Sequence, residues 1–268
     1  MMAIASLVMY DWPEVAAAND ALWTFVAGRL KSQGIEAPAW LDRTRRYDEL
    51  WLSPDLLLAQ TCGYPFATHL RGKVQLLGTP CYGAPGCDGA NYCSVVIASR
   101  SSGIASLAEI VEATAAINSE HSQSGYWALR AAIAATPDGR PPSRAILTGG
   151  HRDSLRLVAT GKADVAAIDA VAWALAGRFE PEALATVRVI ASSPSATGLP
   201  VISALGTPDA TVAALREALA AAIAAPALAS ARAALFLTGF EQLAESAYDG
   251  VLELKRLALT LPFPPLEV

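Results

Sequence analysis

Side chains able to bind an anion gather around a glycine in residues 118–127. After a short apolar stretch and before a helical pattern comes the run Ser122-Gln123-Ser124-Gly125. The first amides of a helix have no internal partner, and the helix dipole favours negative charge there. Serine hydroxyls beside such amides can hold a phosphate, phosphonate, sulfate or carboxylate group without a basic residue. The same serines can instead only cap the helix.

Two further segments place polar side chains where a predicted strand gives way to a predicted helix. In the first, Gly149 and Gly150 permit a tight turn and His151 falls at the helix start. This imidazole can donate to an anion or be a solvated neighbour of the cap. In the second, Asp169 ends an apolar strand, at the sheet edge where α/β proteins bind ligands. Its carboxylate can pair with a ligand ammonium or only cap the next helix.

Three tyrosines, Tyr10, Tyr47 and Tyr64, stand at comparable exits from apolar segments. Tyrosine hydroxyls at sheet edges line binding sites, although structural tyrosines are at least as common.

Catalytic and metal-binding motifs are absent from the sequence. It contains no G-x-S-x-G, no Walker loop, no H-E-x-x-H and no G-x-G-x-x-G after a strand. The four cysteines, Cys62, Cys81, Cys87 and Cys93, lack the usual zinc spacing. Buried thiols are the prediction for them, with a Cys81–Cys87 bridge or a metal site as alternatives. We therefore expect no catalytic residue, no metal and no cofactor.

Strand and helix patterns alternate along the 268 residues. Apolar runs predict strands at 3–9, 39–41, 74–77, 94–98, 115–117, 145–147, 164–168, 187–191 and 199–205. Helical spacing and caps predict helices at 14–31, 54–60, 126–135, 154–160, 171–176, 208–224, 226–235 and 242–259. This alternation predicts an α/β fold with mostly parallel sheets covered by helices.

Two stretches rich in Ser, Pro and Gly, 83–91 and 192–200, bracket a central block of the chain. We therefore expect two lobes: residues 1–90 with 195–268 form lobe 1, and residues 91–194 form an inserted lobe 2. Two chain crossings between lobes suit a hinge.

Composition limits the classes of partner. Hydrophobic residues make up 53% and charged residues 17%, enough for a packed core, and the net charge of −5 argues against nucleic acid or an anionic membrane. The apolar residues 1–10 have no Lys or Arg before them, which predicts a first strand rather than a signal peptide. The alanine-rich residues 211–237 contain charges and Pro226, which predicts helices of a folded domain rather than a membrane span.

Taken together, these segments resemble the phosphate/phosphonate-binding components of ABC transporters, which have the type II periplasmic binding protein fold. The matching segments run in order over most of the chain: 52–57 (LSPDLL), 60–65 (QTCGYP), 85–89 (PGCDG), 122–126 (SQSGY), 149–155 (GGHRDSL) and 161–169 (GKADVAAID).

The resemblance implies roles for the candidate residues. It implies that the turn formed by Ser122, Gln123 and Ser124 holds a phosphonate group through hydroxyls and helix-end amides, with a further oxyanion contact from His151. It implies contacts from Tyr64 and Tyr47 in the first lobe, and one from Asp169 to the amino group of an aminophosphonate. The sequence departs from the family pattern at Gln123, where threonine is usual, and in having no leader before its first strand.

We therefore expect a solute-binding protein that captures a small anionic ligand between two lobes by hinge closure, as for an ABC-type importer. Its expected partners are that ligand and ABC transporter membrane subunits. The resemblance implies a periplasmic location, whereas a complete chain without a leader would be cytoplasmic. The alternative is a leaderless cytoplasmic enzyme or sensor on the same fold, acting on a small carboxylate or phosphorylated metabolite.

Overall fold

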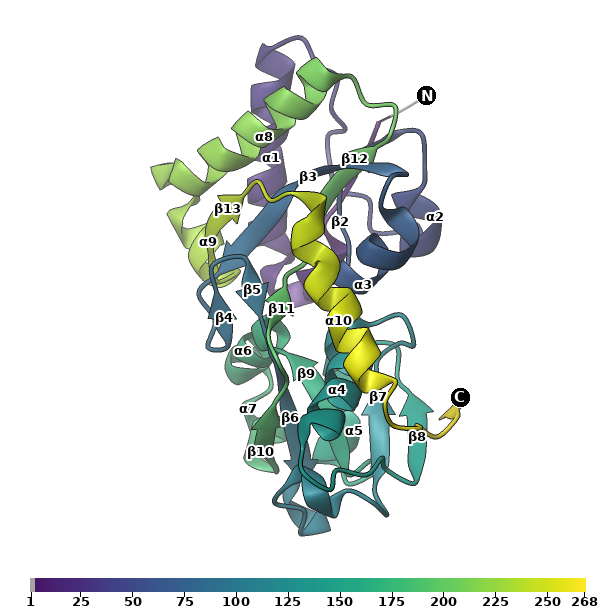
Figure 1. Ribbon diagram of the computed structural model, residues 1–268. Helices are drawn as coiled ribbons and strands as arrows, with labels where there is room; N and C mark the ends of the chain where they lie inside the picture. The colour runs from purple at the N-terminus through teal and green to yellow at the C-terminus, as the bar shows by residue number, and fades with distance from the viewer. Residues whose placement is uncertain (1–2) are drawn as a thin grey trace. The chain divides into compact units, whose positions relative to one another are not determined.

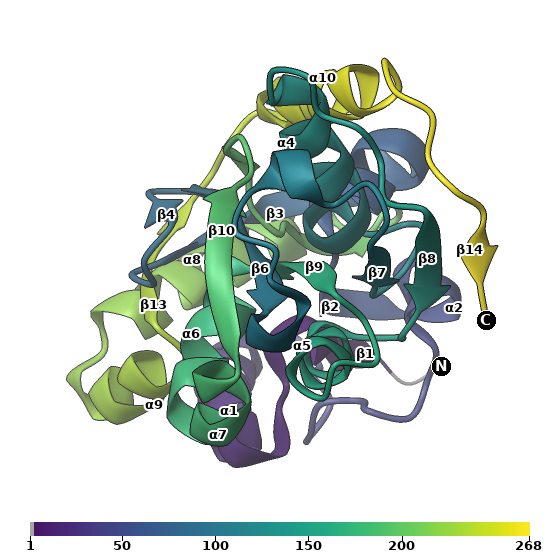
Figure 2. The same cartoon turned by 90° about the horizontal axis from the view of Figure 1, so that it is seen from below.

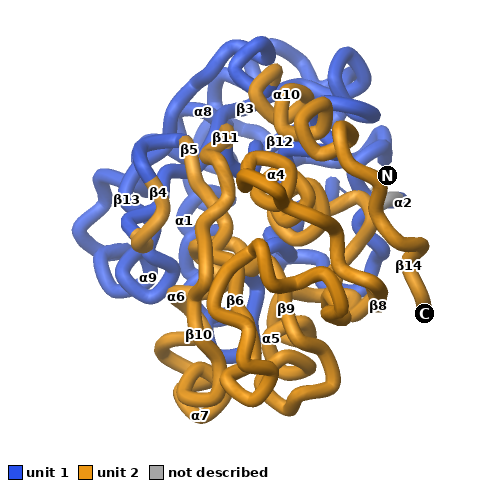
Figure 3. Tube along the Cα trace, turned by 60° about the horizontal axis from the view of Figure 1, so that its bottom comes forward, with its two compact units in different colours: residues 1–83, 88–90, 198–248 blue, residues 84–87, 91–197, 249–268 orange. Residues whose placement is uncertain are grey.

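The chain folds into two compact units (Figure 3). The computed structural model describes residues 3–268, which include the whole of the predicted first strand, residues 3–9. Unit 1 comprises the described residues up to Gly83, with Asp88–Ala90 and Gly198–Tyr248, and unit 2 comprises Ala84–Cys87, Asn91–Thr197 and Asp249–Val268. Residues 249–268, predicted to belong to lobe 1, pack within unit 2, as do the short segments 84–87 and 195–197 at the predicted boundaries.

Unit 1 is built on a five-stranded sheet of order β1-β2-β12-β3-β13. The strands are β1 (Ile4–Ser6), β2 (Leu56–Gln60), β12 (Val201–Ala204), β3 (Val74–Tyr82) and β13 (Leu237–Glu241). Only β1 and β2 pair in parallel among the described strands of this sheet; β12 and β13 run antiparallel to their neighbours.

Helices cover both faces of this sheet (Figure 1). The helices α1 (Ala16–Ser32), α8 (Asp209–Ala224) and α9 (Ala229–Ala234) pack together on one face, and α2 (Tyr47–Trp51) lies on the other. The shorter turns of the unit are Val8–Tyr10, Pro13–Val15, α3 (Gly63–Pro65), Phe66–Leu70, Pro226–Leu228 and Glu245–Tyr248. Among the described residues, no single helix is long and apolar enough to cross a membrane. The bent pair Asp209–Ala224 and Pro226–Ala234 would be long and apolar enough together, judged by length and composition alone.

Unit 2 is built on a six-stranded sheet of order β10-β6-β9-β7-β8-β14. The strands are β10 (Val187–Ser192), β6 (Ser94–Ser99), β9 (Val165–Asp169), β7 (Thr114–Ile117), β8 (Arg144–Leu147) and β14 (Leu266–Glu267). The pairs β9/β7, β7/β8 and β8/β14 are parallel, whereas β10/β6 and β6/β9 are antiparallel. A separate small sheet joins β4 (Cys87–Asp88), β5 (Asn91–Tyr92) and β11 (Ala196–Thr197).

The helices of unit 2 lie on both sides of its large sheet (Figure 2). On one side α4 (Ala128–Ala135) packs against α10 (Asp249–Ala258); on the other lie α5 (His151–Ala159), α6 (Ala170–Phe179) and α7 (Pro181–Ala185). Two short turns, Arg100–Ser102 and Leu107–Glu109, complete the unit together with η6 (Gln123–Trp127). Apolar strand residues such as Ile117 and Val165 meet Leu129 and Ile133 of α4 in a buried core that holds these elements in place.

The α/β class predicted from the sequence is confirmed, and the sheets are mixed in direction. Two local predictions were wrong, and one strand of the unit 1 sheet was missed. Residues 54–60 were predicted as a helix, but Leu56–Gln60 is the buried strand β2, because four consecutive apolar residues fill both faces of a covered sheet. Residues 39–41 form no strand, and Trp40 is 78% exposed. Strand β13 was missed between two predicted helices.

Candidate functional site

The helix that follows β7 begins as the sequence predicts, at the serine-rich turn. Ser122 has an extended backbone, and its Oγ accepts a hydrogen bond from the Gly125 amide at 3.0 Å. Five residues, Gln123–Trp127, then form the π-helical turn η6, which continues into α4. Within residues 3–268 the Ser124 amide makes no hydrogen bond, as expected for the first turn of a helix. A free amide and two serine hydroxyls therefore meet at the start of this helix.

His151 joins these serines from the first position of α5. Its backbone enters the helix after Gly149, which has a φ of +89°, a conformation that favours glycine. Its Nε2 lies 2.7 Å from Ser124 Oγ and 3.4 Å from Asn118 Nδ2. Ser122 Oγ is 3.5 Å from Ser124 Oγ. We call Asn118, Ser122, Ser124 and His151 the serine–histidine cluster.

The imidazole of His151 is held neutral by its surroundings. Burial lowers the pKa of His151 to about 4, while the carbonyl of Ala167 opposes this shift. Nδ1 is fully buried and has no hydrogen-bond partner within the described residues. Other parts of the residue remain partly exposed. At neutral pH this side chain therefore carries one ring proton and no charge.

The lowered pKa of His151 predicts a loss of stability in acid. As the pH falls, the unfolded chain takes up a proton near its ordinary value of 6.5, whereas the folded chain does so only near 4. The stability present above pH 6.5 is therefore lost between these values, by up to about 1.4 kcal/mol per pH unit. Urea unfolding of wild type and His151→Gln at about pH 7 and about pH 4.5 measures how much of the lost free energy of unfolding comes from His151. An equal loss in both proteins would contradict the prediction.

Ser94 lies beside the cluster, although no pattern in the sequence marks it. A small hollow in unit 2 is lined by Tyr92, Cys93, Ser94, Gln123, Ser124, Ala128, Ser193, Pro194, Ala196 and Leu254. Ser94 begins β6 and is 1% exposed, and its Oγ has no hydrogen-bond partner within the described part of the chain. A buried hydroxyl without a partner is uncommon. Ser94 is therefore a further candidate to bind a ligand next to Ser124.

Gln123 and Asp169, two predicted ligand contacts, make hydrogen bonds to the backbone. Gln123 is buried, and its Nε2 donates to the carbonyl of Thr197 at 3.3 Å. Asp169 caps α6: its Oδ1 accepts from the amides of Val171 and Ala172 at 2.7 and 3.1 Å. The structure thus shows the capping role for Asp169, and its contact with a ligand ammonium stays a prediction.

The cysteines are free thiols in the structure. Burial, the nearby Asp169 carboxylate and Cys93 raise the pKa of Cys87 to about 12. Burial and Asp169 also raise the pKa of Cys93. A raised pKa leaves little thiolate at neutral pH, which disfavours nucleophilic chemistry. Among the described residues, no group of three or more His, Cys, Asp or Glu side chains is placed to hold a metal ion.

The three predicted tyrosines belong to unit 1, whereas the serine–histidine cluster belongs to unit 2. Tyr64 is buried in α3, and its ring is nearly perpendicular to that of His69, with 6.4 Å between the ring centroids. Tyr47 is exposed on α2 and packs against Trp51 at 4.9 Å between ring centroids.

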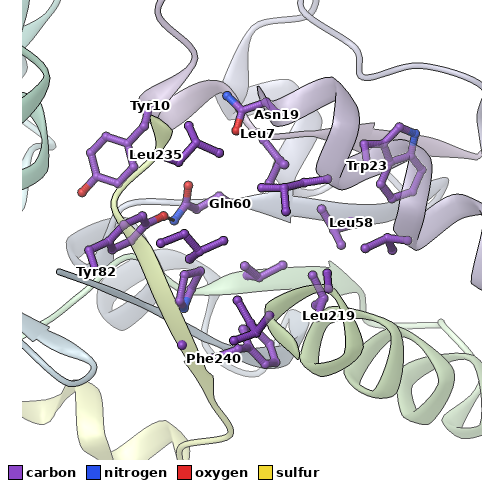
Figure 4. A pocket seen from close by; sticks show the side chains of 18 residues that line it. Leu7, Tyr10, Asn19, Trp23, Leu58, Gln60, Tyr82, Leu219, Leu235 and Phe240 are labelled. Carbon is purple, nitrogen blue, oxygen red and sulfur yellow. Dashed lines mark hydrogen bonds between the residues drawn. The ribbon is translucent and has the colours of Figure 1, made fainter. Parts of the chain in front are cut away.

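Tyr10 lines a pocket in unit 1 (Figure 4). At one end its ring packs edge-on against Tyr82 at 5.2 Å, and Gln60 Nε2 donates to the Tyr82 hydroxyl at 3.1 Å. The remaining walls are mostly apolar and include Trp23, Leu58, Leu219 and Phe240. Apolar walls do not stabilise an anion. This pocket is therefore a poorer anion site than the serine–histidine cluster.

Comparisons with known proteins agree with this assignment of fold. A binding-protein component of an ABC phosphonate transporter from Pseudomonas aeruginosa superposes with a TM-score of 0.74 at 17% identity, over 96% of this chain and 87% of that one. PhnD1 from Prochlorococcus marinus, in complex with methylphosphonate, superposes with a TM-score of 0.74 at 13% identity, over 95% and 97% of the chains. A protein from Xanthomonas citri bound to ATP gives 0.71 at 18% identity, over 97% of each chain. At these identities the likeness shows the fold, which is that of type II periplasmic binding proteins.

The sequence itself matches a protein family. Comparison with individual curated proteins finds no match, so the assignment comes from a family model. The model of the family described as ABC transporter, phosphonate, periplasmic substrate-binding protein matches residues 54–248, a range that includes the whole serine–histidine cluster. Because this match covers well over half of the chain, the protein belongs to the family of periplasmic substrate-binding proteins of phosphonate ABC transporters.

Proposed function

We propose that this protein captures a small anion with a phosphonate- or phosphate-like group at the serine–histidine cluster and presents it to the membrane subunits of an ABC-type importer. The observation that carries the proposal is the convergence of Ser122, Ser124 and His151 at the start of one helix, where the Ser124 amide makes no hydrogen bond within residues 3–268. Family membership supports the class of ligand and the transporter partner.

The chemistry of the cluster suits an anion in a protein of net charge −5. The Ser124 amide and the Ser122 hydroxyl can donate to an oxyanion, and the dipole of the helix through α4 adds a partial positive charge. The hydroxyl of Ser94, which lines one small hollow together with Ser124, can act as a further donor. Each hydrogen bond to a charged group contributes about 1.5–3 kcal/mol. Several such bonds can hold an anion without a lysine or arginine.

A hydrolytic enzyme is the second candidate, because Ser124 and His151 are as close as a nucleophile and its general base. In such enzymes a carboxylate orients the histidine through its other ring nitrogen. Here no carboxylate bonds to Nδ1 among the described residues, and burial shifts the ring pKa to about 4, below the range that suits a general base at neutral pH. We therefore assign Ser124 and His151 to ligand binding rather than catalysis.

Alanine at Ser124 tests the proposal. Isothermal titration with methylphosphonate, aminoethylphosphonate, phosphate, sulfate and small carboxylates should identify at least one phosphonate or phosphate that binds the wild type. Ser124→Ala should weaken that affinity by roughly 10- to 100-fold, since it removes a hydrogen bond to a charged group.

Ser106→Ala is the matched control. Ser106 lies in the same unit, and its hydroxyl donates to Glu109 at 3.0 Å on the surface. This variant should bind like the wild type. Binding of no anion in the panel, or equal affinity in Ser124→Ala and wild type, would contradict the proposed site.

A further inference from the structure

The pocket that Tyr10 lines lies wholly within unit 1, in the layer between the sheet and the helices α1 and α8 (Figure 4). Residues three or four apart share one face of a helix, and each helix lines the pocket with one such set: Asn19, Leu22, Trp23 and Val26 from α1, and Leu219, Ala222 and Ile223 from α8. The strands contribute alternate residues, which point to one face of a sheet: Leu58 and Gln60 from β2, and Pro80 and Tyr82 from β3. A cavity in this layer is unusual, because protein interiors are close-packed and contain few voids larger than a water molecule.

The size and the walls of this cavity favour a small apolar group over water. Its volume is about 70 Å³. An apolar cavity of roughly 150 Å³ holds benzene, so by proportion this one takes about three non-hydrogen atoms. A buried water makes about three hydrogen bonds, whereas these walls are mostly apolar, and the indole N–H of Trp23 donates outside them, to the carbonyl of Pro38 at 3.0 Å. None of the described lining residues is charged, so a neutral ligand fits this pocket best.

The polar groups of the pocket gather at one edge of the sheet. Strands β1 and β2 are parallel, and β12 is antiparallel to both β2 and β3, so β1, β2 and β3 all end at the same edge. Gln60 and Tyr82 are the last residues of β2 and β3, and Tyr10 comes soon after β1. Sheets of α/β proteins bind ligands at the carboxyl ends of their strands. A ligand in the pocket can therefore place a hydroxyl or carbonyl group beside these residues and an alkyl group toward Trp23 and Leu58 at the other end (Figure 4).

We infer that this pocket of unit 1 is a second binding site, for a small neutral molecule with an alkyl group of about three carbons and a hydroxyl or carbonyl group at the carboxyl edge of the sheet. The alkyl group gains free energy by leaving water, which raises the affinity about fourfold for each buried methylene. The amide of Gln60 and the hydroxyl of Tyr82, which are 3.1 Å apart, set the position of the polar group. The site is separate from the proposed anion site, because none of the four residues of the serine–histidine cluster lines it.

Methyl NMR of the full protein, titrated with methanol, ethanol, 1-propanol, 1-butanol and 1-hexanol, tests the inference. The methyl signals of Val26 and Leu58, which line the pocket, should shift, whereas those of Leu129 in the core of unit 2 should stay in place. Affinity should rise about fourfold per methylene up to 1-propanol and then stop rising, because the cavity is filled. Dissociation constants in the millimolar range are expected for a ligand of about four non-hydrogen atoms.

Glycerol is the matched control ligand. It has the three-carbon chain of 1-propanol but carries a hydroxyl on every carbon, so it should bind at least about tenfold more weakly to apolar walls. Equal affinities for glycerol and 1-propanol, or no shift of the Val26 and Leu58 signals with any alcohol, would overturn the inference. Because the serine–histidine cluster does not line this pocket, either result would leave the proposed anion site standing.

Ala222→Leu provides a second readout. The longer side chain fills part of the cavity from α8, so 1-propanol should bind at least about tenfold more weakly, whereas Ala220→Leu, the same change at an exposed position of α8, should bind it like the wild type. Ile223→Val removes one methylene from a wall at little cost in stability and should raise the preferred chain length by about one carbon. Wild-type affinity in a folded Ala222→Leu, or an unchanged preferred chain length in Ile223→Val, would contradict the assignment of this pocket.

Discussion

Replacing Gly125 with alanine should weaken anion binding strongly while leaving most of the fold intact. An added Cβ would lie 1.8 Å from Asn118 Oδ1 and 2.5 Å from its Cγ. Asn118 must then rotate away, losing its bond from the Ser119 amide and its contact with His151. His151 and Ser124 lose their alignment as a result. Because only one side chain has to move, we expect about 1–3 kcal/mol of lost stability and a loss of affinity of about 100-fold or more.

Gly177→Ala is the control for this prediction. Gly177 lies within α6, and a Cβ there meets nothing within 4 Å. Alanine has the higher helix propensity, so this variant should be as stable as the wild type or more stable. Isothermal titration with the anion that binds the wild type and urea unfolding measure both quantities. Wild-type affinity in Gly125→Ala would show that the arrangement of Asn118 and His151 does not support the site.

Replacing Arg130 with alanine should be strongly destabilising. Arg130 lies on α4 and is 8% exposed, and its guanidinium donates to Tyr126 Oη at 2.8 Å and to the carbonyls of Ala258 and Leu261 at 3.3 and 3.2 Å. Ala258 ends α10, so the cation also meets the negative end of that helix dipole. Its carbon Cζ lies 5.2 Å from the ring centroid of Phe263. Truncation leaves buried carbonyls without donors, at a cost of about 3 kcal/mol or more.

Urea unfolding, together with limited proteolysis of the segment after Tyr248, measures this effect. The C-terminal segment should be cleaved faster in Arg130→Ala, because its hydrogen bonds to Arg130 of α4 are lost. Arg144→Ala is the control: Arg144 pairs with Glu267 at an exposed site, and such pairs contribute little. Wild-type stability and proteolysis in Arg130→Ala would mean that α10 is held by its apolar contacts alone.

The fold could be predicted where local patterns agree with packing. The apolar runs of β6, β7 and β9 and the helix starts at Ser122 and His151 follow from residue type and spacing. Strand β2 could not be predicted, because Ser53 and Pro54 form a typical helix start and the four apolar residues at 56–59 are compatible with a helix or a strand. These residues form a strand because they pair within a sheet that is covered by helices on both faces. The packing of α10 against α4 depends on Arg130, a contact that spans more than a hundred residues of sequence.

The candidate site could be predicted in part. Ser122, Ser124 and His151 lie on two segments with clear turn and cap signals, and the structure brings them together. Ser94 could not be found, because it reaches the cluster only through the order of strands in the sheet of unit 2. Asn118 lies in the segment 118–127 that the sequence does single out, but its residue type alone predicts no contact with His151. The contribution of Ala167 comes from its backbone carbonyl and leaves no mark in the residue type. The position of Asp169 at the end of a strand fits a helix cap and a ligand contact equally well, and the sequence does not distinguish the two roles.

A crystal structure of the protein with bound methylphosphonate tests the central claim most directly. We expect the phosphonate oxygens to lie within hydrogen-bond distance of the Ser122 hydroxyl, the Ser124 hydroxyl and the Ser124 amide. A ligand bound elsewhere in the molecule, with Ser122 and Ser124 touching none of its oxygens, would contradict the account.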